Sequence, residues 1–393
     1  MAEVERVALD SVRDLIVVGQ PLPFAVLDAL GRLLLNQGQT VGSDRQFEQL
    51  VERGAWVERP KVEEVRRQRA GAESDIQAAA QRQLSLIDHW QRLTAELALQ
   101  NRALGAGTGR IDAIQPLVSQ LIDLVQRDGD VAIYLCIRQD LKRTRAYAAT
   151  HPVHCAVVCA LAGKGLGWTT AHLHSLVGAA MTMNASFIDL QNQLAEERDP
   201  PTRKQLEKIR AHPHAGAALL RQAGLADPEW LQAVEDHHER SEGSGYPRGA
   251  GEVGDSATLL RLVDVYIAKL SPRIARAALS PHVAVQQMFQ QHGKLPREAP
   301  LAAAVIRTLG GAHPPGALVQ LKSGEVGVVA RRAKTGIPPL VATLSNVRGE
   351  PVVGTQFRDS ADPVFAIAGA LPDPSLFQRV LPERVYGMLL AQP

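Results

Sequence analysis

Four histidines have the chemistry and the grouping to hold a transition metal. His151 stands in HPVHCAVVC, His212 in IRAHPHAG, and His237 and His238 are adjacent. A neutral imidazole nitrogen binds first-row metal ions well at neutral pH. A single histidine in a helical protein is more often a surface or core residue, but an adjacent pair is harder to explain in that way. Neighbouring side chains on a helix point roughly 100° apart, so we expect both to reach one ion only where a helix end faces it.

The stretch HHERSEGSGYP, residues 237–247, resembles the signature of the HD-GYP family. That signature is His-His-Glu-Arg followed by Asp-Gly-x-Gly-Tyr-Pro. The residues that match it are His237, His238, Glu239, Arg240, Gly243, Gly245, Tyr246 and Pro247, and only Glu242 departs from it. The family consists of cyclic-di-GMP phosphodiesterase domains with metal ions held between helices. The resemblance implies that fold and that chemistry for this chain.

The resemblance covers residues 145–280 in the order and spacing of the family. It implies metal ligands at His151, His212, His237, His238 and Asp264. It also implies phosphate contacts from Arg273 and Arg276, which we predict to lie on one face of a helix. The loop residues implied to lie at a ligand or partner site are Arg240, Gly245, Tyr246 and Pro247. The glycines of this loop permit close approach of a ligand.

The chain departs from the family at the His-Asp pair that gives the family its name. Thr182 and Met183 stand at those positions in GAAMTMNASFIDL, with Ser186 in place of a lysine. Tyr147 replaces a glutamate in the same way. In the family the aspartate bridges two metal ions about 3.5 to 4 Å apart, and a thioether does not replace a carboxylate for oxygen-preferring ions. We therefore predict a degenerate HD-GYP domain.

The surviving ligands are unevenly shared between the two sites that the resemblance implies. His151 and Asp264 would be left alone at one site, whereas the three remaining histidines would stay together at the other. We therefore expect one divalent transition metal, which would be iron, manganese or zinc, held by the three imidazoles. With one ion the nucleophile and the phosphate lose their shared clamp, which should slow hydrolysis by several powers of ten.

Two cysteines offer a competing explanation of the first histidine. His151, Cys155 and Cys159 recur at four-residue steps, so their side chains would share one face of a helix, and cysteine with histidine is a zinc ligand set. Both cysteines lie in an apolar run, where free cysteine behaves as a small hydrophobic residue, and we favour this second interpretation. A nucleophilic Cys-His enzyme is disfavoured because one helix face supplies no oxyanion hole and no orienting acid.

These observations favour a role in cyclic-di-GMP signalling. We expect a dinucleotide sensor or an interaction module whose phosphodiesterase activity is absent or strongly reduced. The alternative is an active metal-dependent phosphodiesterase, a hydrolase that uses the depleted site. The partners that the resemblance implies are cyclic-di-GMP and a diguanylate cyclase domain.

The elements that must position these residues are mostly helices. From about residue 130 to 291 the sequence predicts consecutive helices, with small β units at both ends of the chain. FAVLDALGRLLLNQGQ predicts a hairpin near the N-terminus, and a short helix capped by Ser43 follows it. Two strands joined at Ser323-Gly324 are predicted near the C-terminus, with a third in PPLVATL. We divide the chain into an α/β unit at 1–57, a helical linker at 58–128, the degenerate HD-GYP domain at 129–300 and a β subdomain at 301–393.

A long helix is predicted from Pro60 to about Gln100. Its apolar residues Leu86, Trp90, Leu93 and Leu97 fall on one face, which needs a partner. That face either packs on the following domain, which we favour, or pairs with a second copy in a homodimer.

Composition excludes several classes of protein. The 43 Lys+Arg and 41 Asp+Glu leave a formal net charge of +2, too even to make nucleic acid a default partner. Apolar runs fall short of the roughly 20 residues that span a bilayer, and the N-terminus lacks a signal-peptide pattern, so we expect no membrane anchor and a cytoplasmic protein. Three cysteines fit a reducing compartment.

Overall fold

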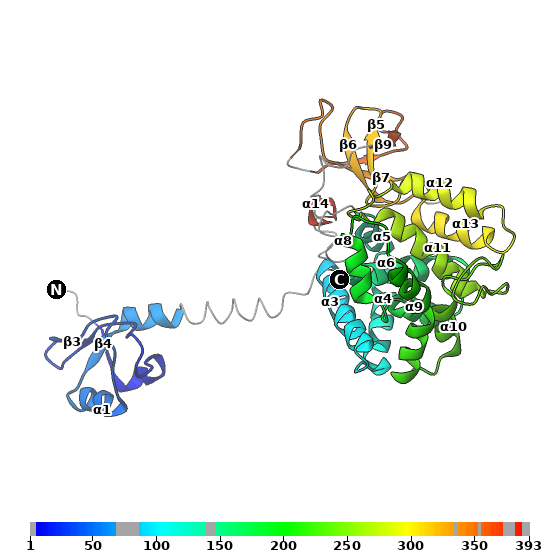
Figure 1. The fold of residues 1–393 in the computed structure, drawn as a ribbon. Coiled ribbons are helices and arrows are strands. Elements are labelled where there is room, and N and C mark those ends of the chain that lie inside the picture. The colour runs from blue at the N-terminus through cyan, green and yellow to red at the C-terminus, as the bar shows by residue number, and fades with distance from the viewer. Residues whose placement is uncertain are drawn as a thin grey trace. The chain divides into compact units, whose positions relative to one another are not determined.

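The computed structural model describes residues 5–67, 86–138, 147–333, 337–352, 355–371 and 382–386. The chain divides into two compact units, Met1–Gln83 and Leu84–Pro393 (Figure 1). The fold is mostly helical with a small antiparallel sheet near each end, as the sequence predicts. The proposed boundaries at residues 57, 128 and 300 stay predictions.

The first unit is a small α/β structure with its own apolar core. Its elements are β1 (Arg6–Ala8), a 3-10 helix (Asp10–Leu15), β2 (Val26–Leu27), β3 (Leu33–Leu35), α1 (Asp44–Glu52) and β4 (Trp56–Glu58). The strand order is β1-β4-β2-β3. The predicted hairpin is confirmed as β2 and β3, and the Ser43 side chain accepts the Gln46 N–H at the start of α1. Residues 59–67 are helical.

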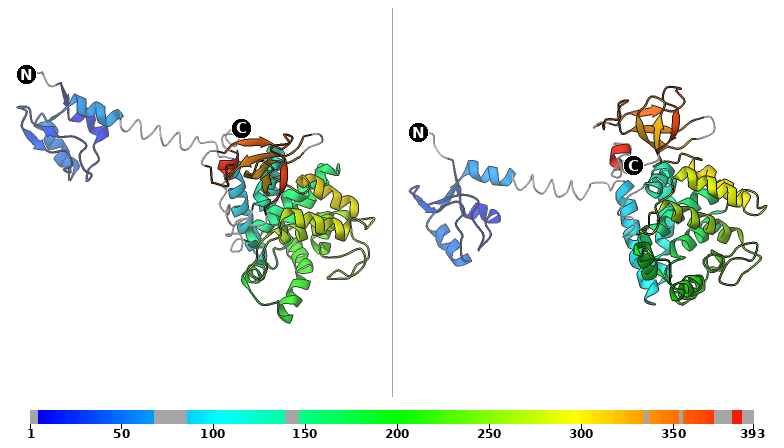
Figure 2. Two further views of the ribbon diagram at one scale, coloured as in Figure 1. Left: turned by 90° about the horizontal axis from the view of Figure 1, so that it is seen from above. Right: turned by 45° about the horizontal axis from the view of Figure 1, so that its top comes forward.

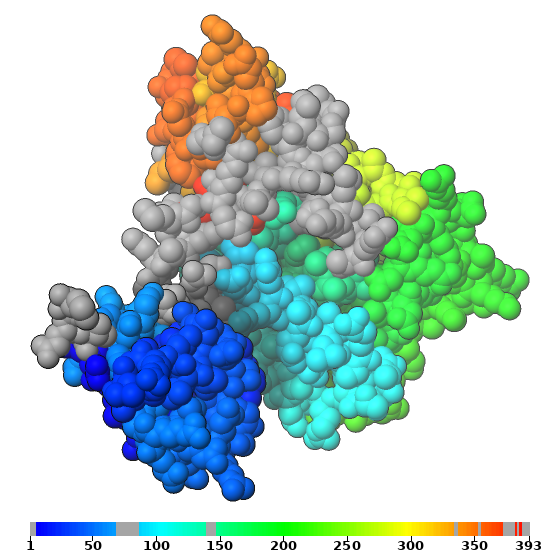
Figure 3. Space-filling view, turned by 90° about the vertical axis from the view of Figure 1, so that its left-hand side faces the viewer, coloured from blue at the N-terminus to red at the C-terminus, as the bar shows by residue number. Residues whose placement is uncertain are grey.

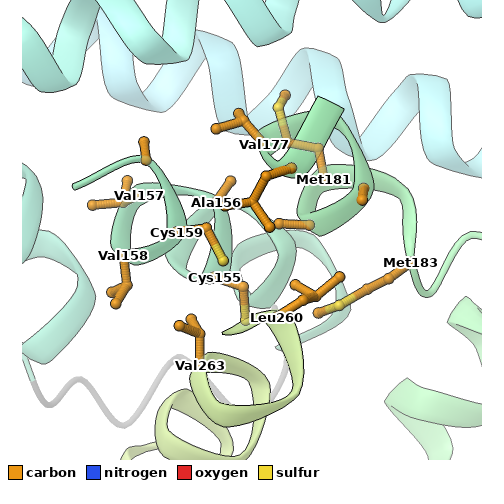
Figure 4. Packing of buried hydrophobic residues seen from close by; sticks show 14 of the residues in the cluster. Cys155, Ala156, Val157, Val158, Cys159, Val177, Met181, Met183, Leu260 and Val263 are labelled. Carbon is orange, nitrogen blue, oxygen red and sulfur yellow. The ribbon is translucent and has the colours of Figure 1, made fainter. Parts of the chain in front are cut away.

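The second unit is built on a helical bundle. Its helices are α3 (Leu86–Gly105), α4 (Gln115–Arg127), α5 (Gly129–Ile137), α6 (Tyr147–Gly165), α7 (Thr170–Thr182), α8 (Ile188–Glu196), α9 (Arg203–Gln222), α10 (Pro228–Asp236), α11 (Asp255–Leu270), α12 (Pro281–His292) and α13 (Ala299–Leu309). Helix α6 is buried along most of its length, as expected of a helix at the centre of a bundle. Helices α4, α5, α7, α11 and α13 pack against it. Figure 4 shows Cys155 and Cys159 of α6 inside this core.

Helix α3 covers the outside of the bundle. Trp90, Leu93 and Leu97 are buried in the bundle core, whereas Leu99 is exposed. Figure 3 shows α3, in cyan, at the surface. The prediction that this stripe packs on the following domain is confirmed. The predicted homodimer through residues 60–100 stays a prediction, and residues 68–85 of that helix lie outside the described residues.

A five-stranded sheet packs at one end of the bundle (Figure 2). Its strands are β5 (Leu318–Leu321), β6 (Val326–Arg331), β7 (Leu340–Thr343), β8 (Phe357–Asp359) and β9 (Ile367–Ala370), in the order β8-β7-β6-β5-β9. The predicted hairpin is β5 and β6, and Gly324 takes the positive φ that its turn requires. The short helix α14 (Pro382–Tyr386) and α5 join the sheet in one apolar cluster. Among the described helices, none is long and apolar enough to cross a membrane.

Candidate metal centre

Three of the predicted ligands meet between α9 and the end of α10. His212 lies on α9, while His237 and His238 follow the last residue of α10, so the helix end faces the cluster as the adjacent pair requires. One nitrogen of each ring lies within 4.8 Å of the others. The Nε2 atoms of His212 and His237 are 3.1 Å apart. We call this group the imidazole site.

A proline and a helix end fix which nitrogen faces the centre. Pro213 has no N–H, so the Ile209 carbonyl lacks its helical donor and accepts Nδ1–H of His212 at 2.6 Å. The Val234 carbonyl, in the last turn of α10, accepts Nδ1–H of His237 at 2.6 Å. A carbonyl oxygen only accepts, so both Nδ1 atoms carry the proton when the rings are neutral.

The two Nε2 atoms therefore direct lone pairs at one another. Lone pairs 3.1 Å apart repel unless a proton or a metal ion lies between them. Two nitrogens bound to one tetrahedral ion at 2.0 to 2.1 Å would be about 3.4 Å apart, close to this separation. The imidazole site thus fits a bound metal without rearrangement of its backbone.

Burial keeps these rings neutral. It lowers the pKa of His212 to about 3, and the neighbouring His237 adds to this effect. Burial also lowers the pKa of His237 and of His238. At pH 7 all three imidazoles are therefore in the form that binds a metal.

Aromatic contacts hold the outer faces of the rings. Phe187 stacks on His212 with ring centroids 4.5 Å apart, and Ser186 Oγ donates to the His212 carbonyl. Phe187 and His212 also line a cavity of about 660 Å³. The cationic residues on its wall are Arg102 and Lys208.

A buried carboxylate shapes the loop that follows the histidine pair. Glu239 is fully buried, and its two oxygens accept the backbone N–H groups of Arg248 and Ala250 at 2.6 and 2.9 Å. A carboxylate that accepts two such bonds compensates much of its desolvation. Glu239 therefore fastens residues 248 and 250 to residue 239, so that residues 239–250 form a closed loop beside the imidazole site.

Among the predicted loop residues, Tyr246 contacts a histidine of the imidazole site. Tyr246 stacks on His238 with centroids 4.6 Å apart, and its N–H donates to the His238 carbonyl. A Cβ on Gly245 would lie 2.5 Å from Arg240 N, so this close approach requires glycine. Pro247 is exposed, and Arg240 lies 3.6 Å from Glu242 in an ion pair.

The other predicted ligands form a second cluster. His151 and Cys155 lie one turn apart on α6, and Asp264 lies on α11. His151 Nε2 is 2.7 Å from Asp264 Oδ1 and 3.5 Å from Cys155 Sγ. Burial raises the pKa of Asp264, but the hydrogen bond and charge of His151 outweigh it, so the carboxyl is ionised at neutral pH. Without an ion, His151 and Asp264 pair with each other through this hydrogen bond.

Comparison with known families decides what this bundle is. Residues 136–297 match the family model described as an HD domain. We refer to this matched part of the chain as the HD domain. The Pseudomonas aeruginosa protein named cyclic di-GMP phosphodiesterase PA4108 is 29% identical over 154 residues, which are 38% of this chain and 36% of that protein. The match thus spans little more than a third of the relative's length. The resemblance to the HD-GYP family is confirmed.

A solved structure also matches this chain. It is Bd1817, described as a HDG"Y"P protein, from Bdellovibrio bacteriovorus. The TM-score is 0.47 at 13% sequence identity, over 79% of this chain and 100% of that chain.

Within the HD domain, Thr182 and Met183 are part of the packed core. Both are fully buried at the end of α7. Thr182 Oγ1 donates to the Gly178 carbonyl and accepts the Trp230 indole N–H at 2.9 Å, so its hydroxyl hydrogen is already used. Figure 4 shows Met183 in the apolar cluster that also contains Cys155.

The predicted helix carrying Arg273 and Arg276 is wrong. Helix α11 ends at Leu270 because Pro272 disfavours helical geometry in the residue before it, and Ser271 is extended. The two arginines lie in a turn and exchange backbone hydrogen bonds. Arg273 Nη2 donates to Tyr147 Oη at 3.0 Å, and Tyr147 stacks on His151.

Sequence reasoning missed Cys155 as a neighbour of Asp264. The four-residue step from His151 predicts a shared helix face, but the apolar run around Cys155 and Cys159 favours packing over a ligand role. Cys159 is core, as expected, and lies outside the His151, Cys155 and Asp264 cluster. The sequence also does not show that Phe187 and Glu239 support the histidines. It indicates Glu239 only as part of the HHER signature.

Proposed function

We propose that this protein acts in cyclic-di-GMP signalling as a dinucleotide sensor or interaction module whose HD domain has lost most or all phosphodiesterase activity. The observation that carries this proposal is the use of Thr182 and Met183 in core packing. Thr182 is bound to Trp230 and Met183 is fully buried among apolar residues. Neither side chain supplies the carboxylate that would bridge two ions.

The imidazole site would hold one divalent transition metal, which is iron, manganese or zinc. Three neutral imidazoles form a sound ligand set for these ions. A bound ion would supply Lewis acidity and lower the pKa of a coordinated water. The residues of this chain hold the rings in place through the Ile209 and Val234 carbonyls and the stacked Phe187 and Tyr246.

Ligand recognition can outlast hydrolysis because it uses other residues. Arg273 is tied to Tyr147 through Nη2, but its Nε has no hydrogen-bond partner among the described residues. A guanidinium N–H that has no partner suits a phosphate oxygen. Aromatic Phe187 and cationic Arg102 and Lys208 line the cavity beside His212, a combination suited to a base and a phosphate.

An active phosphodiesterase is the second candidate, favoured by the intact imidazole site. If the protein is an interaction module, the loop at 239–250 would bind a diguanylate cyclase domain. The exposed Pro247 and Arg240 would contact that partner.

The deciding experiment incubates metal-replete protein with cyclic-di-GMP and follows both binding and the linear product. Binding without product supports the sensor, and product at a rate comparable with intact family members overturns the loss of activity. If neither binding nor product is observed, the interaction module is supported. Pull-down of a purified diguanylate cyclase domain then tests it.

Arg273 is the residue on which to test the binding arm. Arg273→Ala should weaken dinucleotide binding by about 1.5 to 3 kcal/mol, the range for a charged hydrogen bond. Arg203→Ala is a matched control because Arg203 is exposed on α9, where it forms an ion pair with Glu207. Calorimetry that gives equal affinities for the Arg273 variant and wild type would remove Arg273 from the site.

A further inference from the structure

The cluster of His151, Cys155 and Asp264 is more than the remnant of a family site, because it contains a thiol. We infer that these three residues form a second metal site, with Cys155 as a thiolate ligand, which selects zinc-like ions. We call it the thiolate site. The inference goes beyond the proposed function because it adds an ion of a different kind at separate residues.

The spacing on α6 already matches a chelating pair. His151 and Cys155 are four residues apart on one helix face, the arrangement in which two side chains of a helix bind one zinc ion. With zinc about 2.0 to 2.1 Å from nitrogen and 2.3 Å from sulfur, a tetrahedral site separates the two atoms by about 3.6 Å. The Nε2 to Sγ distance here is 3.5 Å.

Asp264 completes the set after a small movement. Its Oδ1 is 2.7 Å from His151 Nε2, a hydrogen-bond distance. Nitrogen and oxygen ligands of one tetrahedral ion would be about 3.3 Å apart. An ion therefore replaces the shared proton and separates the two atoms by about 0.6 Å.

Charge balance favours a divalent ion at this buried position. His151 and Cys155 are almost fully buried, and the Asp264 side chain is 15% exposed. When the ion binds, the Cys155 thiol releases its proton to solvent and the Nε2 proton of His151 moves to Nδ1. One thiolate, one carboxylate and a divalent cation then sum to zero charge, so the site gains no net charge in the interior.

The ligand chemistry sets the metal preference. Thiolate favours zinc and cobalt over manganese and magnesium. Three protein ligands leave a fourth position for water. His151 Nδ1 has no hydrogen-bond partner among the described residues, and such missing support typically lowers metal affinity about 10- to 100-fold. We therefore expect the imidazole site to fill first and the thiolate site second.

The chain supplies its own matched controls. Cys159 lies one turn further along α6 and is also fully buried, but it is not in the cluster. Cys136 is buried on α5, where its Sγ lies 3.8 Å from the His154 carbonyl. A metal bound through sulfur at Cys155 should be insensitive to serine at either of these positions.

The test titrates cobalt(II) into reduced, metal-free full-length protein and records the thiolate-to-cobalt charge-transfer absorption. We expect this band to grow with the second equivalent in wild type, Cys159→Ser and Cys136→Ser, and to disappear in Cys155→Ser. The double variant His212→Ala with His237→Ala should lose the first equivalent and keep the band. That variant separates this inference from the proposed role of the imidazole site.

A second measurement needs no variant. X-ray absorption of wild type loaded with two equivalents of zinc should show a sulfur neighbour at about 2.3 Å. Absence of sulfur from the zinc shell, absence of the cobalt band in wild type, or a band that persists in folded Cys155→Ser would each overturn the thiolate site.

Discussion

Replacing Thr182 by valine should destabilise the HD domain without removing metal from the imidazole site. Thr182 Oγ1 accepts the indole N–H of Trp230 at 2.9 Å, and both residues are almost completely buried. Valine has nearly the same shape but accepts no hydrogen bond. The indole cannot turn to water because it packs directly on α7, where a Cβ on Gly178 would meet its ring at 2.4 Å.

The expected loss of stability follows from the Trp230 indole N–H, which has no acceptor in the Thr182→Val variant. A buried donor without a partner costs about 1 to 3 kcal/mol. For a domain of this size each kcal/mol lowers the melting temperature by about 2 to 4 °C, so a fall of roughly 2 to 12 °C is expected. Thermal melts of metal-free protein measure it, and metal content is measured in parallel.

A double-mutant cycle isolates the bond. In a Trp230→Phe background the indole N–H is gone, so Thr182→Val should then cost much less than it does alone. Equal costs in both backgrounds would show that the hydrogen bond contributes nothing. Loss of the imidazole-site metal from a Thr182→Val protein of unchanged stability would refute the structural role of Thr182 altogether.

Three further predictions concern the loop, pH and the missing pair. Gly245→Ala should raise protease sensitivity of the loop and weaken metal binding, because its Cβ would strike backbone atoms at 2.5 Å, whereas Gly251→Ala, with nothing within 4 Å, should change neither. Burial lowers the pKa of each imidazole-site histidine below 6.5, so the unfolded state takes up protons first. The unfolding free energy of metal-free protein should thus fall below about pH 6.5 by up to about 1.4 kcal/mol per pH unit per histidine, and urea denaturation that gives the same value at pH 7.5 and 5.5 contradicts this. Thr182→His with Met183→Asp should melt lower than wild type without metal and recover with manganese or iron, since an ion that binds only the folded state stabilises it; a folded variant that metal does not stabilise shows that α7 does not face the histidines.

Local features of the fold could be predicted because their causes are local. The cap at Ser43, the turn at Gly324 and the buried stripe of α3 each depend on residues within a few positions of one another. The adjacent histidines likewise required a helix end, and α10 ends directly before them.

Features that depend on distant packing could not be predicted in the same way. His151 and Asp264 are separated by 113 positions, and only the packing of α6 on α11 places Cys155 beside both. The three-residue spacing of Arg273 and Arg276 predicts a shared helix face, but Pro272 ends the helix before them. The hydrogen bond from Trp230 to Thr182 joins residues 48 positions apart, and no pattern in either segment predicts it.

The buried Glu239 couples the conformation of the loop to that of His238, a proposed metal ligand. Its carboxylate fastens residues 248 and 250, while the same loop returns Tyr246 to the face of His238. A ligand that restricts the loop therefore also restricts His238. Thermodynamic linkage requires the change in binding free energy to be equal in both directions. A partner that binds the exposed side of the loop at residues 239–250 would increase the affinity of the imidazole site for its ion. The ion would increase the affinity for the partner by the same factor.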